Sequence, residues 1–280
     1  MTNFLLNLLK KVTKTLEGTG IGKIKPLFKI YAFLLSYLKP RMVVTEGSKM
    51  YLDKNDSLLL SVYPNFEPAE TKLIKRWVKS GMVVVDAGAH IGYFTLLMAK
   101  LVGQTGKVHS FEPGKENFTL LKKNVQVNNY KNVVLNQTAL SNKVGKVRLY
   151  ISDDNPQDHR IIGNERSKKY EVVETTTLDR YFGNSGKVEF VKMDIQGAEV
   201  LALEGGRRLL SNNKGLKMII EFWPFVLKRG GVDSKKFFDK LQTVGLVKLI
   251  DERDGKLIEN FKLDFSGQSE NKLYNLLIQT

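Results

Sequence analysis

Residues 83–92, VVVDAGAHIG, constrain the fold more than any other stretch of the chain. Three consecutive valines predict a strand that is buried on both faces, as in the interior of a parallel sheet. Asp86 ends this strand, Gly88 and Gly92 bracket a tight turn, and a helix begins at Tyr93. Glycines let backbone approach a ligand closely, and a helix N-terminus offers free N–H groups. The stretch therefore predicts a cradle for a nucleotide-sized ligand.

Strands and helices alternate from this turn onward, which is typical of right-handed β–α–β units around a parallel sheet. The expected strands are 82–86, 107–111, 133–137, 188–193, 216–221, 246–250 and 273–278, and the expected helices are 93–101, 116–128, 178–182, 198–210 and 234–244. Two further strands, 146–151 and 170–176, form a β insertion at about 143–177. Ahead of the turn, 50–52 and 58–62 are predicted as short strands and 70–79 as a helix.

The N-terminal region has a different character. Residues 4–16 combine leucines with Lys10, Lys11 and Lys14 in a basic amphipathic pattern, and residues 27–38 are strongly apolar. This apolar run is about half the ~20 residues that a membrane span needs, and no signal-peptide pattern is present. We predict a helical extension at 1–42 and a main domain at 43–280. The extension either packs on the domain or makes peripheral contact with a membrane.

The amino-acid composition excludes several kinds of catalytic and metal site. The 280-residue chain has no cysteine, which excludes disulfides, thiol nucleophiles and Cys-based metal sites, and fits a reducing, cytoplasmic setting. With three histidines, a multi-histidine metal site is not expected either. Three loop acids offer an oxygen-ligand site that we do not favour: Asp153, Asp154 and Asp158. We therefore predict no metal.

The formal charge of +15 suggests an anionic partner such as nucleic acid, a membrane surface or a phosphorylated substrate. Residues 1–50 hold nine Lys or Arg residues and two acidic ones, which gives them nearly half of that charge.

Three predicted strands are each followed by an acidic residue or end in one: Asp86, Glu112 and Asp194. Ligands of doubly wound sheets bind outside the carboxyl ends of the strands, so these carboxylates should face one crevice. Glu112 follows Asp86 by 26 residues, near the ~20-residue offset of a ribose-binding acid. The turn lacks the middle glycine with which a dinucleotide site approaches a pyrophosphate, since Ala89 and His90 occupy that region. S-adenosylmethionine (SAM), which has no phosphates, fits better than NAD.

Val85-Asp86-Ala87-Gly88-Ala89-His90-Ile91-Gly92-Tyr93-Phe94-Thr95 resembles the first motif of class I SAM-dependent methyltransferases, and specifically of the FkbM family. The likeness covers about residues 45–280 and continues, in order, through Phe111-Glu112-Pro113, Asn117, Ala139-Leu140-Ser141, Thr176-Thr177-Leu178-Asp179, residues 192–199 (KMDIQGAE) and Glu221. It implies an α/β, Rossmann-like fold with a seven-stranded, mostly parallel sheet whose last strand is antiparallel. It also implies SAM as the cofactor.

The resemblance implies a role for each matching position. The methionine end of SAM would lie against Asp86, Gly88, Gly92 and Tyr93, the ribose against Glu112, and the adenine near Phe111, Pro113, Thr138 and Ala139. His90 occupies a turn position that is commonly Asn in the family, and either side chain can form hydrogen bonds there. Asp194 would lie where the methyl group meets its acceptor.

Methyl transfer needs positioning and removal of the acceptor's proton. Asp194 and Glu199 are the leading candidates for binding or deprotonating a hydroxyl, although Glu199 also suits a helix start. His159, in the insertion loop, is a further candidate base, although a lone loop histidine is usually only solvated. Its neighbour Arg160, together with Glu221 and Trp223 after the fifth strand, would bind the acceptor.

We therefore expect a SAM-dependent O-methyltransferase that acts on a hydroxyl of a sugar, glycan or glycolipid, as FkbM-like enzymes do. The charge keeps RNA methylation open as an alternative, but no RNA-binding module or Asn-Pro-Pro-Tyr-type motif is present. A SAM-binding scaffold without activity is the non-enzyme alternative.

Overall fold

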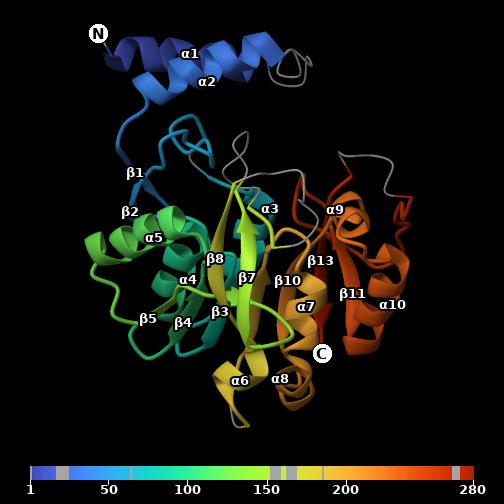
Figure 1. Ribbon diagram of the computed structural model, residues 1–280. Helices are drawn as coiled ribbons and strands as arrows, with labels where there is room; N and C mark the ends of the chain where they lie inside the picture. Colours follow the sequence, from blue (N-terminus) through green and yellow to red (C-terminus); the bar gives the residue numbers. More distant parts are fainter. Residues whose placement is uncertain are drawn as a thin grey trace. The chain divides into compact units, whose positions relative to one another are not determined.

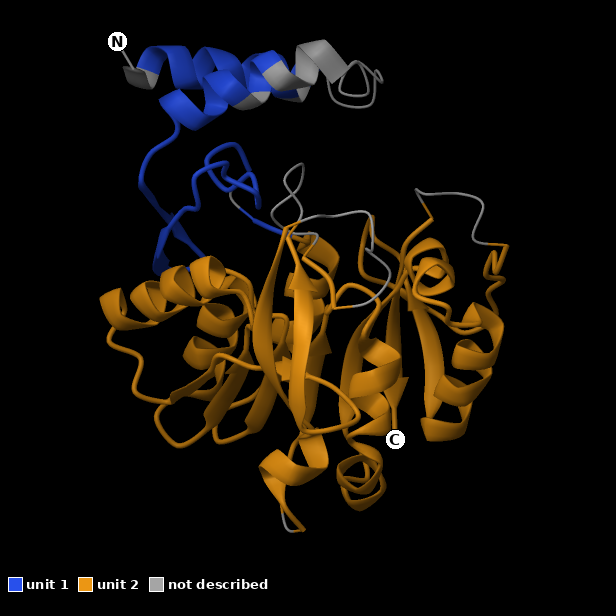
Figure 2. Cartoon of the chain, in the orientation of Figure 1, with its two compact units in different colours: residues 1–66 blue, residues 67–280 orange. Residues whose placement is uncertain are grey.

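The computed structural model describes residues 2–16, 25–63, 65–151, 159–161, 169–184, 186–266 and 272–280. The chain forms two compact units, Met1–Phe66 and Glu67–Thr280 (Figure 2). Within the described part, none of the helices combines the length and the apolar character needed to cross a bilayer. The predicted limit of the extension at residue 42 stays a prediction.

The first unit contains two helices and a β-hairpin. These are α1 (Thr2–Leu16), α2 (Lys25–Leu38), β1 (Met42–Thr45) and β2 (Ser48–Tyr51). Leu6, Leu35 and Val62 form its buried cluster. The strand predicted at 58–62 is wrong, because the carboxylate of Asp56 accepts hydrogen bonds from the amides of Leu60 and Ser61 (3.0 and 2.9 Å) and curls the segment into turns.

The second unit is built on one large sheet, whose strand order is β12-β11-β13-β10-β9-β3-β4-β5 (Figure 1). Its strands are β3 (Val83–Ala87), β4 (Lys107–Phe111), β5 (Val133–Asn136), β9 (Phe190–Met193), β10 (Lys217–Phe222), β11 (Leu246–Ile250), β12 (Leu257–Ile258) and β13 (Tyr274–Gln279). The central strands β5, β4, β3, β9 and β10 are parallel, and β13 runs antiparallel to β10 and β11. The Rossmann-like prediction is confirmed; the two-residue β12 is an addition to the seven predicted strands.

Helices connect these strands. They are α3 (Pro68–Trp77), α4 (Tyr93–Val102), α5 (Lys115–Val127), α6 (Leu178–Phe182), α7 (Glu199–Glu204), α8 (Arg207–Asn212), α9 (Pro224–Arg229) and α10 (Ser234–Val244). The single helix predicted at 198–210 is divided into α7 and α8. The division falls at Gly205-Gly206, where backbone passes so close that a Cβ on Gly205 would lie 2.1 Å from the carbonyl oxygen of Ser141.

The insertion forms a separate three-stranded sheet from β6 (Ala139–Leu140), β7 (Gly145–Tyr150) and β8 (Tyr170–Thr176). The strand β8 pairs antiparallel with β7 and parallel with β6. Ala139, Leu149 and Val173 form a buried hydrophobic cluster on this sheet.

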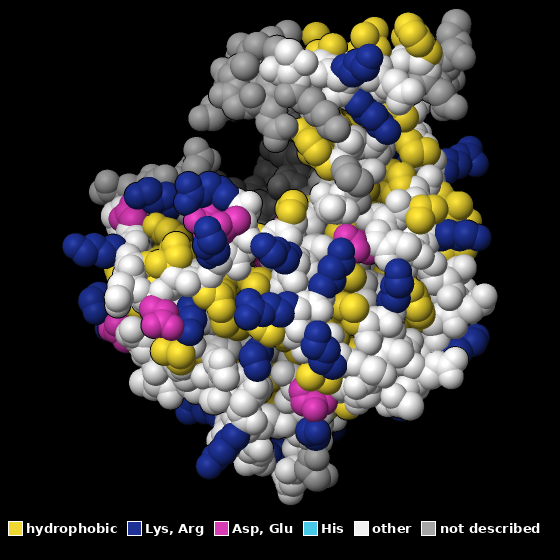
Figure 3. All heavy atoms as spheres, turned by 180° about the vertical axis from the view of Figure 1, so that it is seen from behind, with side chains coloured by type: hydrophobic (Ala, Val, Ile, Leu, Met, Phe, Trp, Pro, Cys, Tyr) yellow, Lys and Arg dark blue, Asp and Glu magenta, His cyan; other side chains and the backbone are white. Residues whose placement is uncertain are grey.

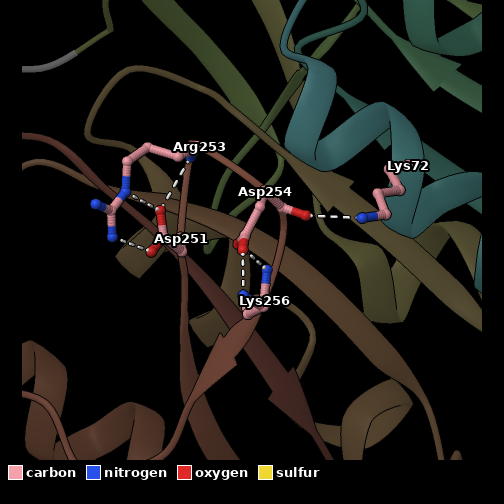
Figure 4. Close-up of polar contacts among 5 residues, drawn as sticks. All are labelled: Lys72, Asp251, Arg253, Asp254 and Lys256. Atoms are coloured by element: carbon pink, nitrogen blue, oxygen red, sulfur yellow. Dashed lines mark hydrogen bonds and ion pairs between the residues drawn. The ribbon is translucent and has the colours of Figure 1, made fainter.

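A polar turn after β11 is tied to α3 (Figure 4). Asp251 accepts hydrogen bonds from the guanidinium of Arg253, and Asp254 pairs with Lys256. Lys72 of α3 donates to the carbonyl oxygen of Asp254 over 2.9 Å. The position of α3 matters because Glu67 at its N-cap and Glu70 in its first turn belong to the candidate active site.

Candidate active site

The ends of three adjacent parallel strands meet at the centre of the sheet. In the register, Ala87 of β3 lies opposite Phe111 of β4 on one side and Met193 of β9 on the other. Glu112 and Asp194 are the next residues of β4 and β9, so both acids flank the turn that follows Asp86. The structure thus brings the three predicted strand-end carboxylates to one edge of the sheet.

The turn after β3 is packed so tightly that its glycines are sterically required. The amide of Gly88 donates to the carbonyl oxygen of Phe111 (3.0 Å), with φ at +82°. A Cβ on Gly88 would lie 1.8 Å from the carbonyl oxygen of Asp194. One on Gly92, at φ +101°, would lie 2.7 Å from the side chain of Leu121. These contacts hold the backbone amides at the start of α4 beside the strand ends.

Asp86 is buried under the turn, with 1% of its surface exposed. Its carboxylate accepts a short hydrogen bond from the hydroxyl of Thr95, which also bonds with Ser110 at 2.8 Å. Burial raises the pKa of Asp86 to about 6, and the Thr95 hydrogen bond opposes the rise. Asp86 therefore fixes the position of α4 relative to β3 and β4.

Glu112 connects the turn to β4. Its two carboxylate oxygens accept hydrogen bonds from the amides of His90 (2.9 Å) and Gly114 (2.8 Å). Burial raises the pKa of Glu112 to about 7, against the lowering effect of these hydrogen bonds. His90 has a φ of +49°, unusual for a residue with a side chain. The backbone of His90 therefore has a structural role, because its N–H donates a hydrogen bond to Glu112.

The predicted adenine-side residues surround the ends of β4 and β5. Phe111 is buried and packs edge-on against Tyr181 at 4.9 Å, so its side chain belongs to the core. Pro113 and Thr138 are half-buried and Ala139 is buried. The Thr138 hydroxyl oxygen is shielded from solvent and has no hydrogen-bond partner among the described residues. A ligand atom placed there could supply one.

The side chain of Tyr93, the first residue of α4, is buried against α3. Its side chain is 4% exposed, and its hydroxyl bonds with that of Thr71 in α3 at 3.3 Å. Its ring packs edge-on against Phe94 at 5.1 Å. The contact of Tyr93 with SAM stays a prediction.

Asp194 is the most accessible of the strand-end acids, with 24% of its side chain exposed. The side-chain Nε2 of Gln196 donates hydrogen bonds to the carboxylates of Asp194 (2.8 Å) and Glu221 (3.1 Å). Gln196 adopts a left-handed backbone, with φ at +55°. Burial, followed by the charges of Asp194 and Glu199, raises the pKa of Glu221 well above its usual range. Glu221, whose pKa is raised, and the side-chain amide of Gln196 thus lie beside the accessible carboxylate of Asp194.

A buried lysine lies behind this carboxylate. Lys192 is 1% exposed, and its Nζ lies 3.8 Å from Asp194 Oδ2 and 3.6 Å from Glu67 Oε2. Burial lowers the pKa of Lys192, but the charges of Glu67, Asp194 and further acids outweigh it, so the net pKa is raised. Burial also raises the pKa of Glu67 to about 7. Glu70, one turn further along α3, is likewise buried with a raised pKa.

Glu199 is the first residue of α7 and is 1% exposed. Its carboxylate accepts a hydrogen bond from the amide of Ile195 (2.9 Å). Burial raises the pKa of Glu199 to about 7. This geometry matches the helix-start alternative more closely than that of a base facing an acceptor; a catalytic role for Glu199 stays a prediction.

The insertion loop contributes His159 and Arg160. A Cβ on Gly114 would lie 2.9 Å from Glu112 Oε1 and 3.6 Å from His159 Nδ1, which places His159 on the Glu112 side of the turn. Arg160 is 4% exposed, and its guanidinium carbon lies 5.2 Å from the ring centroid of Trp223. The structure thus joins Arg160 to Trp223, but it sets His159 near the predicted ribose side. Asp153, Asp154 and Asp158 lie outside the described residues.

These residues fit SAM. Gly88 and Gly92 let the turn pack directly against the strand ends, and the Glu112 carboxylate lies beside that turn, where ribose hydroxyls could donate to it. The Thr138 hydroxyl lacks a partner among the described residues, so a ligand atom could supply one. Three or more His, Asp or Glu side chains arranged to hold a metal ion do not occur within the described ranges.

Sequence reasoning missed the roles of Lys192, Glu67, Glu70 and Gln196. Lys192 carries a signal, since it lies between the apolar residues Val191 and Met193 of a predicted buried strand, where a charge needs a buried partner. Glu70 carries a weaker one, because it shares the helical face of Leu73, Ile74 and Trp77. No pattern marks Glu67.

The methyltransferase FkbM domain matches residues 86–255. No curated protein matches the chain in sequence. Among solved structures it is similar to a SAM-dependent methyltransferase from Aquifex aeolicus (15% identity, 75% of this chain and 88% of that one, TM-score 0.42). It is also similar to an rRNA methylase from Streptococcus thermophilus (13% identity, 75% of this chain and 93% of that one, TM-score 0.42). A third similar structure is a SAM-dependent O-methyltransferase from Thermotoga maritima (12% identity, 88% of this chain and 80% of that one, TM-score 0.43). The FkbM match includes Asp86, Glu112, Asp194 and Glu221.

Proposed function

The chain belongs to the FkbM family of methyltransferases, and on that premise we propose that it transfers the methyl group of SAM to a hydroxyl of a sugar, glycan or glycolipid. The observation that carries this choice of acceptor is the network of Asp194, Gln196 and Glu221 (2.8 and 3.1 Å). An accessible carboxylate beside further oxygen acceptors suits an acceptor rich in hydroxyl donors.

Asp194, Gln196 and Lys192 each have a proposed part in the transfer. When bound, SAM supplies an electrophilic methyl group, which moves from sulfur to the acceptor oxygen as the sulfonium charge disappears. Asp194 takes the hydroxyl proton, because an alcohol is a weak nucleophile until a base within hydrogen-bond reach accepts that proton. Gln196 orients the Asp194 carboxylate, and Lys192 compensates its charge from the buried side.

The charges near Asp194 favour a neutral acceptor over a phosphate-rich one. Despite the net charge of +15, the side chains around Lys192 are mainly acidic: Glu67, Glu70, Asp194 and Glu221. These carboxyls disfavour an RNA backbone close to the reacting atoms. Trp223, which Arg160 backs at 5.2 Å, offers an aromatic face at the end of β10 against which a sugar ring could pack.

A lipid-linked glycan would also account for the basic, apolar N-terminal segment. We place the enzyme on the cytoplasmic side, in peripheral contact with the inner face of a membrane.

Incubation of the protein and radiolabelled SAM with fractionated lysate of the source organism, followed by mass spectrometry of the labelled product, tests the acceptor. We expect label in glycan or glycolipid fractions, and methyl groups on oxygen. Label confined to RNA would overturn the assignment. Asp194→Ala should abolish most of the transfer while SAM affinity stays within about twofold, because it removes a base and not a ligand of SAM. A non-catalytic scaffold would give no label with either protein.

A further inference from the structure

We infer that α1 and α2 together present a surface that lies in the interface of a bilayer containing anionic lipid. This inference goes beyond the methyl-transfer proposal and does not depend on the acceptor. It rests on three features of the two helices: their exposed apolar side chains, the burial of their other faces, and their charge.

More than half of the large hydrophobic side chains that are exposed in the described part of the chain lie on these helices. They are Phe4, Leu5, Leu8, Val12, Ile30, Phe33, Leu34 and Tyr37. Tyr37 is 82% exposed, Phe4 72% and Phe33 68%. From behind, Figure 3 shows hydrophobic and basic side chains together on this helical part of the molecule.

The exposed residues follow helical periodicity, so each helix has a continuous apolar stripe. Residues 30, 33, 34 and 37 of α2 have the spacing of one helix face, as do residues 4, 8 and 12 of α1. A scattered set of surface hydrophobics would not show this spacing.

The same helices already bury a separate set of residues within their own unit. Leu6 of α1 and Leu35 of α2 are 7% and 1% exposed and cluster with Val62, and Leu9, Tyr31 and Leu38 pack against them. The exposed stripes are therefore not the faces that hold the first unit together. They are apolar surface in addition to it.

Charge selects the kind of partner. The described helices contain five lysines, Lys10, Lys11, Lys14, Lys25 and Lys29, and no acidic residue. A second copy would bring like charges together without a compensating carboxylate, which disfavours self-association through this surface. Anionic lipid headgroups compensate the lysines while the acyl boundary takes up the apolar stripes, and Tyr and Phe suit that boundary. The helices are too short and too charged to span, so they would lie parallel to the surface.

Flotation of the full chain with lipid vesicles tests the inference. We expect binding to phosphatidylcholine vesicles that contain about a third phosphatidylglycerol, weaker binding in high salt, and little binding to phosphatidylcholine alone. The variant Phe33→Asp with Tyr37→Asp should bind at least about tenfold more weakly, because it places two charges in the apolar stripe. The matched control is Val144→Asp with Val172→Asp, which changes two exposed hydrophobics of the second unit (53% and 61%) and should bind like the parent.

Thermal unfolding and SAM binding of both double variants should match those of the parent, so that loss of flotation reports the surface alone. Absence of binding to anionic vesicles, or equal loss in both variants, would overturn the inference. A dimer that sediments in ultracentrifugation and is lost with Phe33→Asp and Tyr37→Asp would assign the surface to a second copy instead. Methyl transfer is not part of this readout, so failure of the acceptor assignment leaves it unaffected.

Discussion

The ammonium group of Lys192 lies 3.8 Å from the carboxylate of Asp194, two residues further along the chain. Alternate residues of a strand share a face, so this pairing follows from the strand that ends between them. Lys192 is 1% exposed and the Asp194 side chain is 24% exposed, so one charge of the pair is buried while the other reaches solvent. The candidate base is thus held from behind by a cation that water does not reach.

Replacement of this lysine should be costly. Lys192→Met removes the counter-charge of Glu67 and Asp194, and we expect it to lower the free energy of unfolding at pH 7 by about 3–5 kcal/mol. The loss should shrink at pH 5, because Glu67, whose pKa is raised to about 7, is already neutral there. Urea unfolding at both pH values measures this. Lys240→Met, which removes a more exposed pair with Glu204 (2.8 Å), should cost less than about 1 kcal/mol. Equal losses would contradict the prediction.

SAM affinity should depend on the ionisation of Glu112. Burial raises its pKa from 4.5 to about 7, so its contribution to the stability of the free protein is fully present below pH 4.5 and is lost as the pH rises through 7. Ribose hydroxyls donate to the ionised form, so SAM should bind more tightly at pH 8 than at pH 6. Glu112→Gln should weaken binding about tenfold or more and flatten this pH profile. Calorimetric titration with the exposed Glu116→Gln as control tests both; an unchanged profile in Glu112→Gln would refute the assignment.

The steric demand at Gly88 can be separated from its backbone conformation. Gly88 and Gly215 share a φ of +82°, but a Cβ meets the Asp194 carbonyl oxygen at 1.8 Å in the first and nothing within 4 Å in the second. Gly215→Ala should therefore cost only about 1 kcal/mol of unfolding free energy, from the left-handed backbone. Gly88→Ala should cost at least about 2 kcal/mol more and abolish SAM binding. Chemical unfolding of the two variants measures both losses of unfolding free energy. Similar losses would contradict the steric demand at Gly88 and mean that the turn can move aside.

The hydroxyl of Thr95 should be needed to keep Asp86 buried. Thr95→Val preserves the shape but removes the hydrogen bond to Asp86, and we expect it to cost about 1–3 kcal/mol. Thr95 lowers the pKa of Asp86, so its loss raises that pKa above about 6. The cost should then be larger at pH 8, where the charged form is buried, than at pH 5. Thr119→Val, at an exposed position of α5, should be nearly neutral at both. A cost independent of pH would count against this account.

The sequence patterns predicted the sheet because periodicity and turn residues act locally. The valines before Asp86 and the strand-ending acids Glu112 and Asp194 were sufficient to predict that these three acids lie at one edge of the sheet. Local patterns could not show that Gly205 must clear the Ser141 carbonyl oxygen, so the expected helix at 198–210 was too long. Nor could they show that the 58–62 segment would turn around the carboxylate of Asp56.

The polar partners within the site depend on contacts between segments far apart in the chain. Glu67 meets Lys192 across 125 positions, and nothing in either neighbourhood specifies the other. The predicted end of a strand also places a residue at one edge of the sheet, but it does not give the direction of its side chain. Phe111 accordingly turns into the core and Tyr93 toward Thr71, while the backbone of His90 supplies the contact with Glu112.

The insertion leaves the main fold and returns to it at the same point. Leu140 of β6 lies opposite Thr176 of β8, and the amide of Ser141 donates to the Thr176 carbonyl oxygen at 2.9 Å. Because its two ends are joined to each other, we expect changes in the length of the segment between them to leave the central strands in place. A segment anchored in this way is a place where a family can vary in sequence and length without changing its central sheet.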